Sequence, residues 1–194
     1  MAASDTEIVN LALIALGAET IESLDDDGNG AAVTARTVYA ACRDALLRAY
    51  PWRFAIRRAV LTAAAPGAVA FGFTYAWQLP DACLRVLSIG DRPCDPPEPY
   101  SVEGEALLTD AEPPVPIRYI VRVTEAPRFD ASFVEILGLK LAAAMCERIT
   151  GSTSKMEALD ARAARLVREA RRLGAMEQPP QPVAQPSDWL GARL

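Results

Sequence analysis

Four cysteines are the first residues whose type could do chemistry, because a thiolate can bind a metal ion or attack a substrate. Successive members lie 41, 11 and 52 positions apart, at Cys42, Cys83, Cys94 and Cys146. No two have the Cys-x-x-Cys spacing of a zinc site, and the chain contains no histidine to complete such a site or to act as a base. We therefore predict reduced, small apolar residues in a protein that folds in a cytoplasmic environment.

Two groups of acidic residues could bind a cation or move a proton. The run Asp25-Asp26-Asp27-Gly28-Asn29-Gly30 resembles the beginning of a calcium loop, but its acids are consecutive and no glutamate follows at the required position. It predicts an acidic turn that favours the N-terminus of the next helix. Glu103 and Glu105 fall in an expected hairpin, which is typical of the solvated side of a strand. Phosphate-binding loops and nucleophile elbows are absent, so we expect no enzyme, no cofactor and no metal.

Charge is arranged in blocks along the chain, whose net charge is −5. Residues 1–35 hold seven acids and no Lys or Arg, whereas residues 36–65 hold six arginines and one acid. Residues 66–145 are acidic overall and residues 146–194 are basic overall. Such blocks suit docking against another copy or a partner of opposite sign. They could equally neutralise each other within one fold.

Hydrophobic periodicity predicts four helices, over residues 4–16, 31–50, 130–149 and 153–174. Ser4 and Glu7 have the spacing of a capping box for the first helix, and Gly17 is expected to end it. In the second helix Arg43 lies away from the apolar stripe, which consists of Ala35, Val38, Tyr39, Cys42, Ala45, Leu46 and Ala49.

The last helix combines a narrow apolar stripe with many arginines. The stripe steps at heptad spacing through Met156, Leu159, Ala163, Leu166, Ala170 and Leu173, and Gly174 is expected to end the helix. The arginines could contact DNA phosphates, but Glu157, Asp160 and Glu169 lie among them. The interleaved acids favour contact with another subunit over contact with DNA.

Residues 66–125 change character, with glycines, prolines and short apolar runs. Alternation at Trp52, Phe54 and Ile56 predicts that a strand begins just before this block. Within it we expect one small antiparallel sheet, with strands over residues 73–78, 84–89, 99–102, 105–109 and 115–123.

The predicted fold class is α+β, with a helical bundle body, an inserted small antiparallel β-sheet and an extended C-terminal tail. The body comprises residues 1–65 and 126–175, the β-rich insertion residues 66–125, and the Pro-rich tail residues 176–194. Four prolines favour an extended tail, yet it carries large apolar residues near its end. Either the tail folds back on its own subunit or it is a docking peptide that binds a partner.

Several short segments, in this order, carry a resemblance to a known family. They are Asn10-Leu11-Ala12-Leu13 with Leu16-Gly17, Tyr50-Pro51-Trp52-Arg53-Phe54-Ala55, Tyr75-Ala76-Trp77-Gln78-Leu79-Pro80-Asp81, Leu84-Arg85-Val86 and Ile117-Arg118-Tyr119-Ile120. With the predicted element order, the chain resembles the tail tubular protein A family, the head-to-tail adaptors of short-tailed bacteriophages. The resemblance covers nearly the whole chain, and none of its segments is a catalytic motif.

The resemblance implies a structural virion protein that forms a homo-oligomeric ring, a dodecamer in the relatives. The ring would join the portal protein to the tail nozzle and let genomic DNA pass through its lumen during ejection, without sequence recognition. It would be located at the head–tail interface, after assembly in the bacterial host cytoplasm. No apolar run in the sequence is long enough to span a membrane.

Two sets of residues are then expected to make the contacts. Subunit-interface ion pairs are predicted from Arg57, Arg58, Arg165, Arg168 and Arg172. Docking of the tail on the portal or on an adjacent copy is predicted through Trp189, Leu190, Arg193 and Leu194. The alternative function is a DNA-associated helical binding module that uses the last helix.

Overall fold

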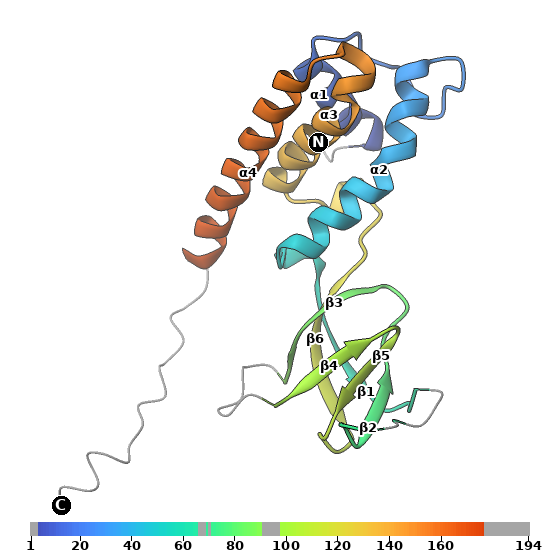
Figure 1. Ribbon diagram of the computed structural model, residues 1–194, viewed down its shortest axis with the longest axis vertical. Helices are drawn as coiled ribbons and strands as arrows, with labels where there is room; N and C mark the ends of the chain where they lie inside the picture. Colours follow the sequence, from blue (N-terminus) through green and yellow to red (C-terminus); the bar gives the residue numbers. More distant parts are fainter. Residues whose placement is uncertain (1–3, 66–68, 70, 91–97, 177–194) are drawn as a thin grey trace, which may run out of the picture.

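The computed structural model describes residues 4–65, 69, 71–90 and 98–176, and its helices and antiparallel sheets confirm the predicted α+β class. The helices gather at one end of the molecule and the strands at the other (Figure 1). The described helices are α1 (Asp5–Leu16), α2 (Gly30–Ala49), α3 (Ala131–Thr150) and α4 (Thr153–Met176). The described strands are β1 (Ile56–Leu61), β2 (Tyr75–Gln78), β3 (Cys83–Ile89), β4 (Tyr100–Glu103), β5 (Ala106–Thr109) and β6 (Val115–Val121).

Side-chain caps determine where the first two helices begin. The predicted capping box of α1 is present: the Ser4 hydroxyl accepts from the Glu7 N–H at 3.1 Å, and the Glu7 carboxylate accepts from the Ser4 N–H at 2.7 Å. Gly17 ends α1 as expected, in the left-handed conformation at φ 70°, which only glycine adopts without strain. Helix α2 begins at Asn29, whose side-chain oxygen accepts two backbone N–H groups of the first turn.

The β part contains two three-stranded sheets among the described residues, and the expectation of one sheet is therefore wrong. Sheet A has the order β1-β6-β3 and sheet B the order β2-β5-β4. The chain after β1 joins them, because the Ala65 N–H donates to the Ala76 carbonyl of β2 at 2.9 Å. Strands β2, β4 and β5 have four residues each, and their main pairing is with one another. Each of the five strands predicted within residues 66–125 matches an observed one to within two residues at each end.

The first strand begins later than the alternation at Trp52 predicted. A 3₁₀ turn at Arg53–Ala55 precedes β1, because the Trp52 indole N–H donates to the Leu46 carbonyl at 3.0 Å and holds this segment against α2. Strand β1 then pairs antiparallel with β6. It lies within residues 1–65, which we assigned to the helical body, yet its pairing is entirely with the β part.

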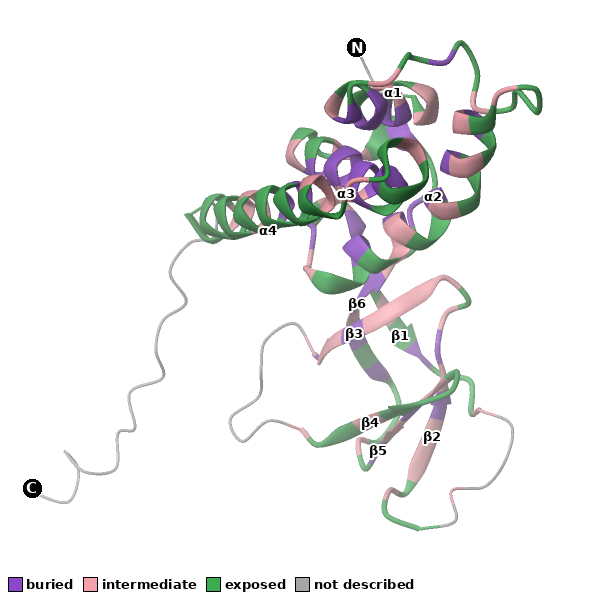
Figure 2. Ribbon diagram, turned by 45° about the horizontal axis from the view of Figure 1, so that its top comes forward, coloured by how far each residue is buried: buried purple, intermediate pink, exposed green. Residues whose placement is uncertain are grey.

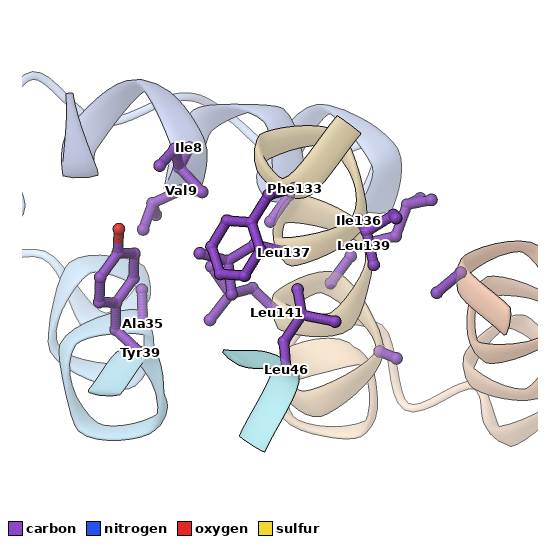
Figure 3. Close-up of a cluster of buried hydrophobic side chains, with 14 of the residues drawn as sticks. Ile8, Val9, Ala35, Tyr39, Leu46, Phe133, Ile136, Leu137, Leu139 and Leu141 are labelled. Atoms are coloured by element: carbon purple, nitrogen blue, oxygen red, sulfur yellow. The ribbon is translucent and has the colours of Figure 1, made fainter. Parts of the chain in front are cut away.

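Helix α3 lies in the middle of the larger core. Figure 3 shows Phe133 and Leu137 of α3 between α1 and α2, facing Ile8, Val9 and Tyr39. All of these side chains are buried. An aromatic cluster extends this core, since the ring of Phe133 meets those of Trp52, Phe54 and Phe129 at centroid distances of 5.1, 5.1 and 4.8 Å. A second, smaller cluster around Trp77, Leu107 and Ile117 fills the β part.

Ionic and backbone contacts join the helices to sheet A. The Asp44 carboxylate of α2 pairs with Arg43 at 2.9 Å and with Arg122, just after β6, at 2.8 Å. Arg48 of α2 also donates to the Leu84 carbonyl of β3 at 2.7 Å. Arg43 was expected to lie away from the core, but it is only 9% exposed. Its pairing with Asp44 compensates the charge at this buried position.

Helix α4 continues two residues beyond its expected end. Gly174 was predicted to end it, but the helix runs to Met176. The reason for a glycine here is packing, since a Cβ atom at this position would lie 2.7 Å from the Tyr50 hydroxyl. The Arg53 guanidinium donates to the Gly174 carbonyl at 2.8 Å and holds this end of α4 against the aromatic cluster.

Candidate functional site

The acidic loop, which we define as residues 19–27 between α1 and α2, presents carboxylates to solvent. Its exposed acids are Glu19, Glu22, Asp25, Asp26 and Asp27. Asn10 of α1 fixes the start of the loop, because its side-chain amide donates to the Ile21 carbonyl and accepts from the Ile21 N–H, both at 2.9 Å. At the other end Asp27 pairs with Arg36 of α2. Contacts with α1 and α2 thus hold both ends of the acidic loop, which contains no Lys or Arg.

The arginine face of α4 consists of Arg165, Arg168 and Arg172. Spacings of three and four residues place these side chains on one side of the helix. All three are exposed, and none forms an ion pair with a residue that the structure describes. Two other charges of α4 pair with α3: Asp160 lies 2.8 Å from Lys140, and Arg162 lies 3.5 Å from Glu135. The arginine face therefore has three cations without an ion pair among the described residues, and Glu169, four residues after Arg165 and three before Arg172, adds one exposed acid beside them.

These two surfaces lie on opposite sides of the helical end. Helix α4 runs along one side of α3, whereas the acidic loop precedes α2 on the other side (Figures 1 and 2). Figure 2 shows that α4 is exposed along most of its length away from α3. Opposite charges on opposite sides of one subunit allow an identical subunit to dock beside it in the same orientation, which is a heterologous contact.

The predicted interface arginines lie on two separate elements. Arg165, Arg168 and Arg172 form the arginine face, but Arg57 and Arg58 belong to β1. Arg57 is exposed and donates to the carbonyls of Phe54 and Ile56 at 3.0 and 2.9 Å, so part of its donor capacity serves the local backbone. Arg58 is exposed and lies opposite Arg118 of β6 in the strand register. The predicted docking residues Trp189, Leu190, Arg193 and Leu194 fall outside the described residues.

The cysteines have the surroundings of structural residues. Cys42, Cys83 and Cys146 are free thiols, and Cys94 lies outside the described residues. Burial raises the pKa of the Cys42 and Cys83 thiols, which lowers their thiolate fraction near neutral pH. Cys146 is buried, with its sulfur 3.3 Å from the Thr150 hydroxyl.

Other candidate chemistry finds no assembled site in the part of the chain that is described. No group of three or more acids and cysteines there could hold a metal ion. Glu103 is the last residue of β4 and Glu105 lies in the turn that leads to β5, and both are exposed. None of the described helices is long and apolar enough to cross a membrane.

An apolar cleft between α2 and α4 was not anticipated from the sequence. It has a volume of about 600 Å³. Its walls are small or apolar, and its rim is cationic; the lining residues are Cys42, Ala45, Leu46, Ala49, Lys140, Ala164, Val167, Arg168 and Arg171. Two alanines of the predicted apolar stripe of α2 were the sequence signal for this cleft. Ala45 and Ala49 are exposed instead of packed. The small alanine side chains preserve the helical periodicity of the stripe, but they do not fill the space between α2 and α4.

Comparison with known families and curated proteins identified no relative of this chain. No protein-family model matches the chain, and a search of curated proteins found no match. Its function must therefore be inferred from the surfaces described above.

Proposed function

We propose that this protein is a structural virion component, a head-to-tail adaptor whose copies form a ring between the portal protein and the tail nozzle. The chain's resemblance to the tail tubular protein A family suggests the role, the dodecameric ring and the passage of DNA through its lumen. Its task would be contact between subunits rather than catalysis. Its location would be the head–tail interface of the virion, after assembly in the host cytoplasm.

One observation carries the proposal: the acidic loop and the arginine face lie on opposite sides of the helical end. A ring needs such an arrangement, since each copy must offer one surface to the next copy and a different surface to the previous one. Exposed charges of this kind favour correct encounter and register more than they add affinity. The ring contact should therefore weaken as salt is added.

The decisive measurement is the native mass of the protein, alone and with the portal protein of the same virus. We expect a ring, either free or assembled on the portal. A chain that stays monomeric in both conditions would count against the adaptor.

Charge reversal tests the surfaces themselves. Arg165→Glu combined with Arg172→Glu should prevent ring assembly, and Asp25→Lys with Asp26→Lys added in the same chain should restore it. Arg128→Glu is a matched control, because Arg128 is exposed but pairs at 2.9 Å with Glu125 of its own turn. Assembly that is unaffected by the double reversal would remove the arginine face from the contact.

A DNA-associated binding module remains the second candidate, and the arginine face is the observation that favours it. Three exposed arginines on one helix side can contact successive phosphates. A mobility shift with duplex DNA that weakens steeply with salt would support this function. The absence of any shift at low salt would exclude it.

A further inference from the structure

We propose that the cleft between α2 and α4 receives the Asp188-Trp189-Leu190 segment from the tail of a neighbouring copy. The inference rests on the part of the proposed function that places copies side by side, and it identifies a contact that the charged surfaces do not explain. The cleft and the segment are complementary in polarity and in charge, and the length of the tail fits a contact with a neighbouring copy.

The floor of the cleft is apolar and incompletely filled. Ala45, Ala49 and Ala164 are exposed in it, while Cys42 and Val167 are half-buried. Five small or apolar residues around a volume of about 600 Å³ leave room for a large side chain. Covering this surface with a tryptophan and a leucine would remove apolar area from water, which is favourable.

Among the described residues, Arg168 is the cation of the rim that has neither an ion pair nor a ring contact. Lys140 pairs with Asp160 at 2.8 Å, and the Arg171 guanidinium lies 5.5 Å from the centre of the Tyr50 ring. Arg168 has no ion pair among the described residues. An acid next to the apolar pair in the incoming segment matches this rim, and Asp188 directly precedes Trp189.

The reach of the tail indicates a neighbour's cleft rather than its own. Trp189 follows Met176, the end of α4, by 13 residues, and prolines at 179, 180, 182 and 186 favour an extended chain between them. At about 3.1 Å per residue such a chain spans about 40 Å. The α4 side of its own cleft runs from Arg171 to Ala164, 5 to 12 residues before Met176, which is about 8–18 Å along the helix. An extended chain of this length would exceed that distance, so it would have to double back to fill its own cleft.

Cys42 provides a direct test, because it already lines the cleft. Leu190→Cys should form a disulfide with Cys42 of another copy under mild oxidation, giving covalent multimers on a non-reducing gel. Adding Cys42→Ser should abolish those multimers and leave only the background from the other cysteines. Melting curves of each full-length variant show that its fold is intact.

A second, independent test fills the cleft with a larger side chain. Ala164→Tyr should fill the cleft and suppress the cross-link, whereas Ala161→Tyr, at an exposed α4 position outside the lining, should not. Arg168→Glu should lower the cross-link yield about two- to fivefold, the range for an exposed ion pair. Adding Asp188→Arg to the Arg168→Glu variant should recover the cross-link yield.

The outcomes separate this inference from the proposed function. A disulfide confined to single chains means that the tail folds back, and it overturns the inference. A ring with no cross-link above the Cys42→Ser background keeps the adaptor and overturns the tail contact. Cross-linked multimers in a protein that ignores the portal support the tail contact and count against the adaptor. A monomer that forms no cross-link overturns the inference as well.

Discussion

Helices α3 and α4 are adjacent in the chain, but α3 has ten buried residues among its 20 and α4 has two among its 24. In α3 the buried side chains face α1, α2 and α4, so nearly every side of the helix meets protein. In α4 burial is limited to Leu159 and Ala163, with half-buried residues continuing the same stripe. A helix enclosed in this way determines the fold, whereas a helix attached by one stripe leaves its other sides free for partners. Mutations in α3 should therefore mainly lower stability, whereas mutations on the exposed sides of α4 should mainly affect contacts with partners.

The largest effect is expected in α3. Leu137→Ala removes a side chain with no exposed surface and should lower the free energy of unfolding by about 3–4 kcal/mol, since the packed surroundings cannot collapse onto the cavity. Urea denaturation measures this loss. The matched variant in α4 is Leu173→Ala, which changes a side chain that is 59% exposed and should alter stability by less than about 0.5 kcal/mol. Equal losses in the two variants would show that α4 is as tightly packed as α3.

A smaller effect is expected where α4 is attached. Leu159 is 8% exposed, and Leu159→Ala should cost about 2 kcal/mol, at the lower end for a core leucine. One side of this position is near solvent, so the structure can relax around the cavity. The same urea experiment ranks it against Leu137→Ala, and a cost above that of Leu137→Ala would show that α4 is part of the main core.

A hydrogen bond between α1 and α2 makes the stability of the helical end depend on pH. The Tyr39 hydroxyl donates to Asp5 at 2.6 Å, and burial together with this bond raises the pKa of Tyr39 well above its usual value. The unfolded chain releases the proton at pH about 10, but the folded chain retains it. The contribution of Tyr39 to stability should therefore be full below pH 10 and be lost as the pH rises above it. Tyr39→Phe should cost about 1 kcal/mol at pH 7 and flatten the alkaline decline, whereas an unchanged decline would assign it to other groups.

Only a small effect on global stability is expected where Arg53 attaches the far end of α4. Arg53→Ala removes the hydrogen bond to the Gly174 carbonyl and should change the free energy of unfolding by less than about 1 kcal/mol. Hydrogen exchange should nonetheless speed up in the last turns of α4 while α3 stays protected. Arg57→Ala is the control, because Arg57 donates only to nearby carbonyls among its described bonds. Faster exchange throughout α3 would contradict the separate roles of the two helices.

Features that depend on neighbouring residues were predictable from the sequence. The Ser4–Glu7 capping box, the helix end at Gly17 and the strand positions in the β part were all expected and are observed. Each is determined within a few residues by capping, by backbone conformation or by alternation.

Features that depend on distant contacts were not predictable in the same way. The division into two sheets follows from which strands pair across the chain. The burial of Arg43 depends on Asp44 and, through it, on Arg122, which lies 78 residues beyond Asp44. The position of Gly174 inside a helix depends on Tyr50. The cleft has the same origin, since a stripe of alanines has the periodicity of a core but not its volume.

The two hydrogen bonds between Asn10 and Ile21 have a kinetic consequence. They anchor the acidic loop to α1, so its carboxylates are already positioned before any partner arrives. A preorganised charge cluster spends little conformational entropy when a complex forms, and its field can guide a diffusing partner into the productive orientation. Asn10→Ala would leave every charge of the loop in the chain but disperse it over many conformations. Association through the proposed ring contact would then become slower and less sensitive to ionic strength, even though no residue of that proposed contact had changed.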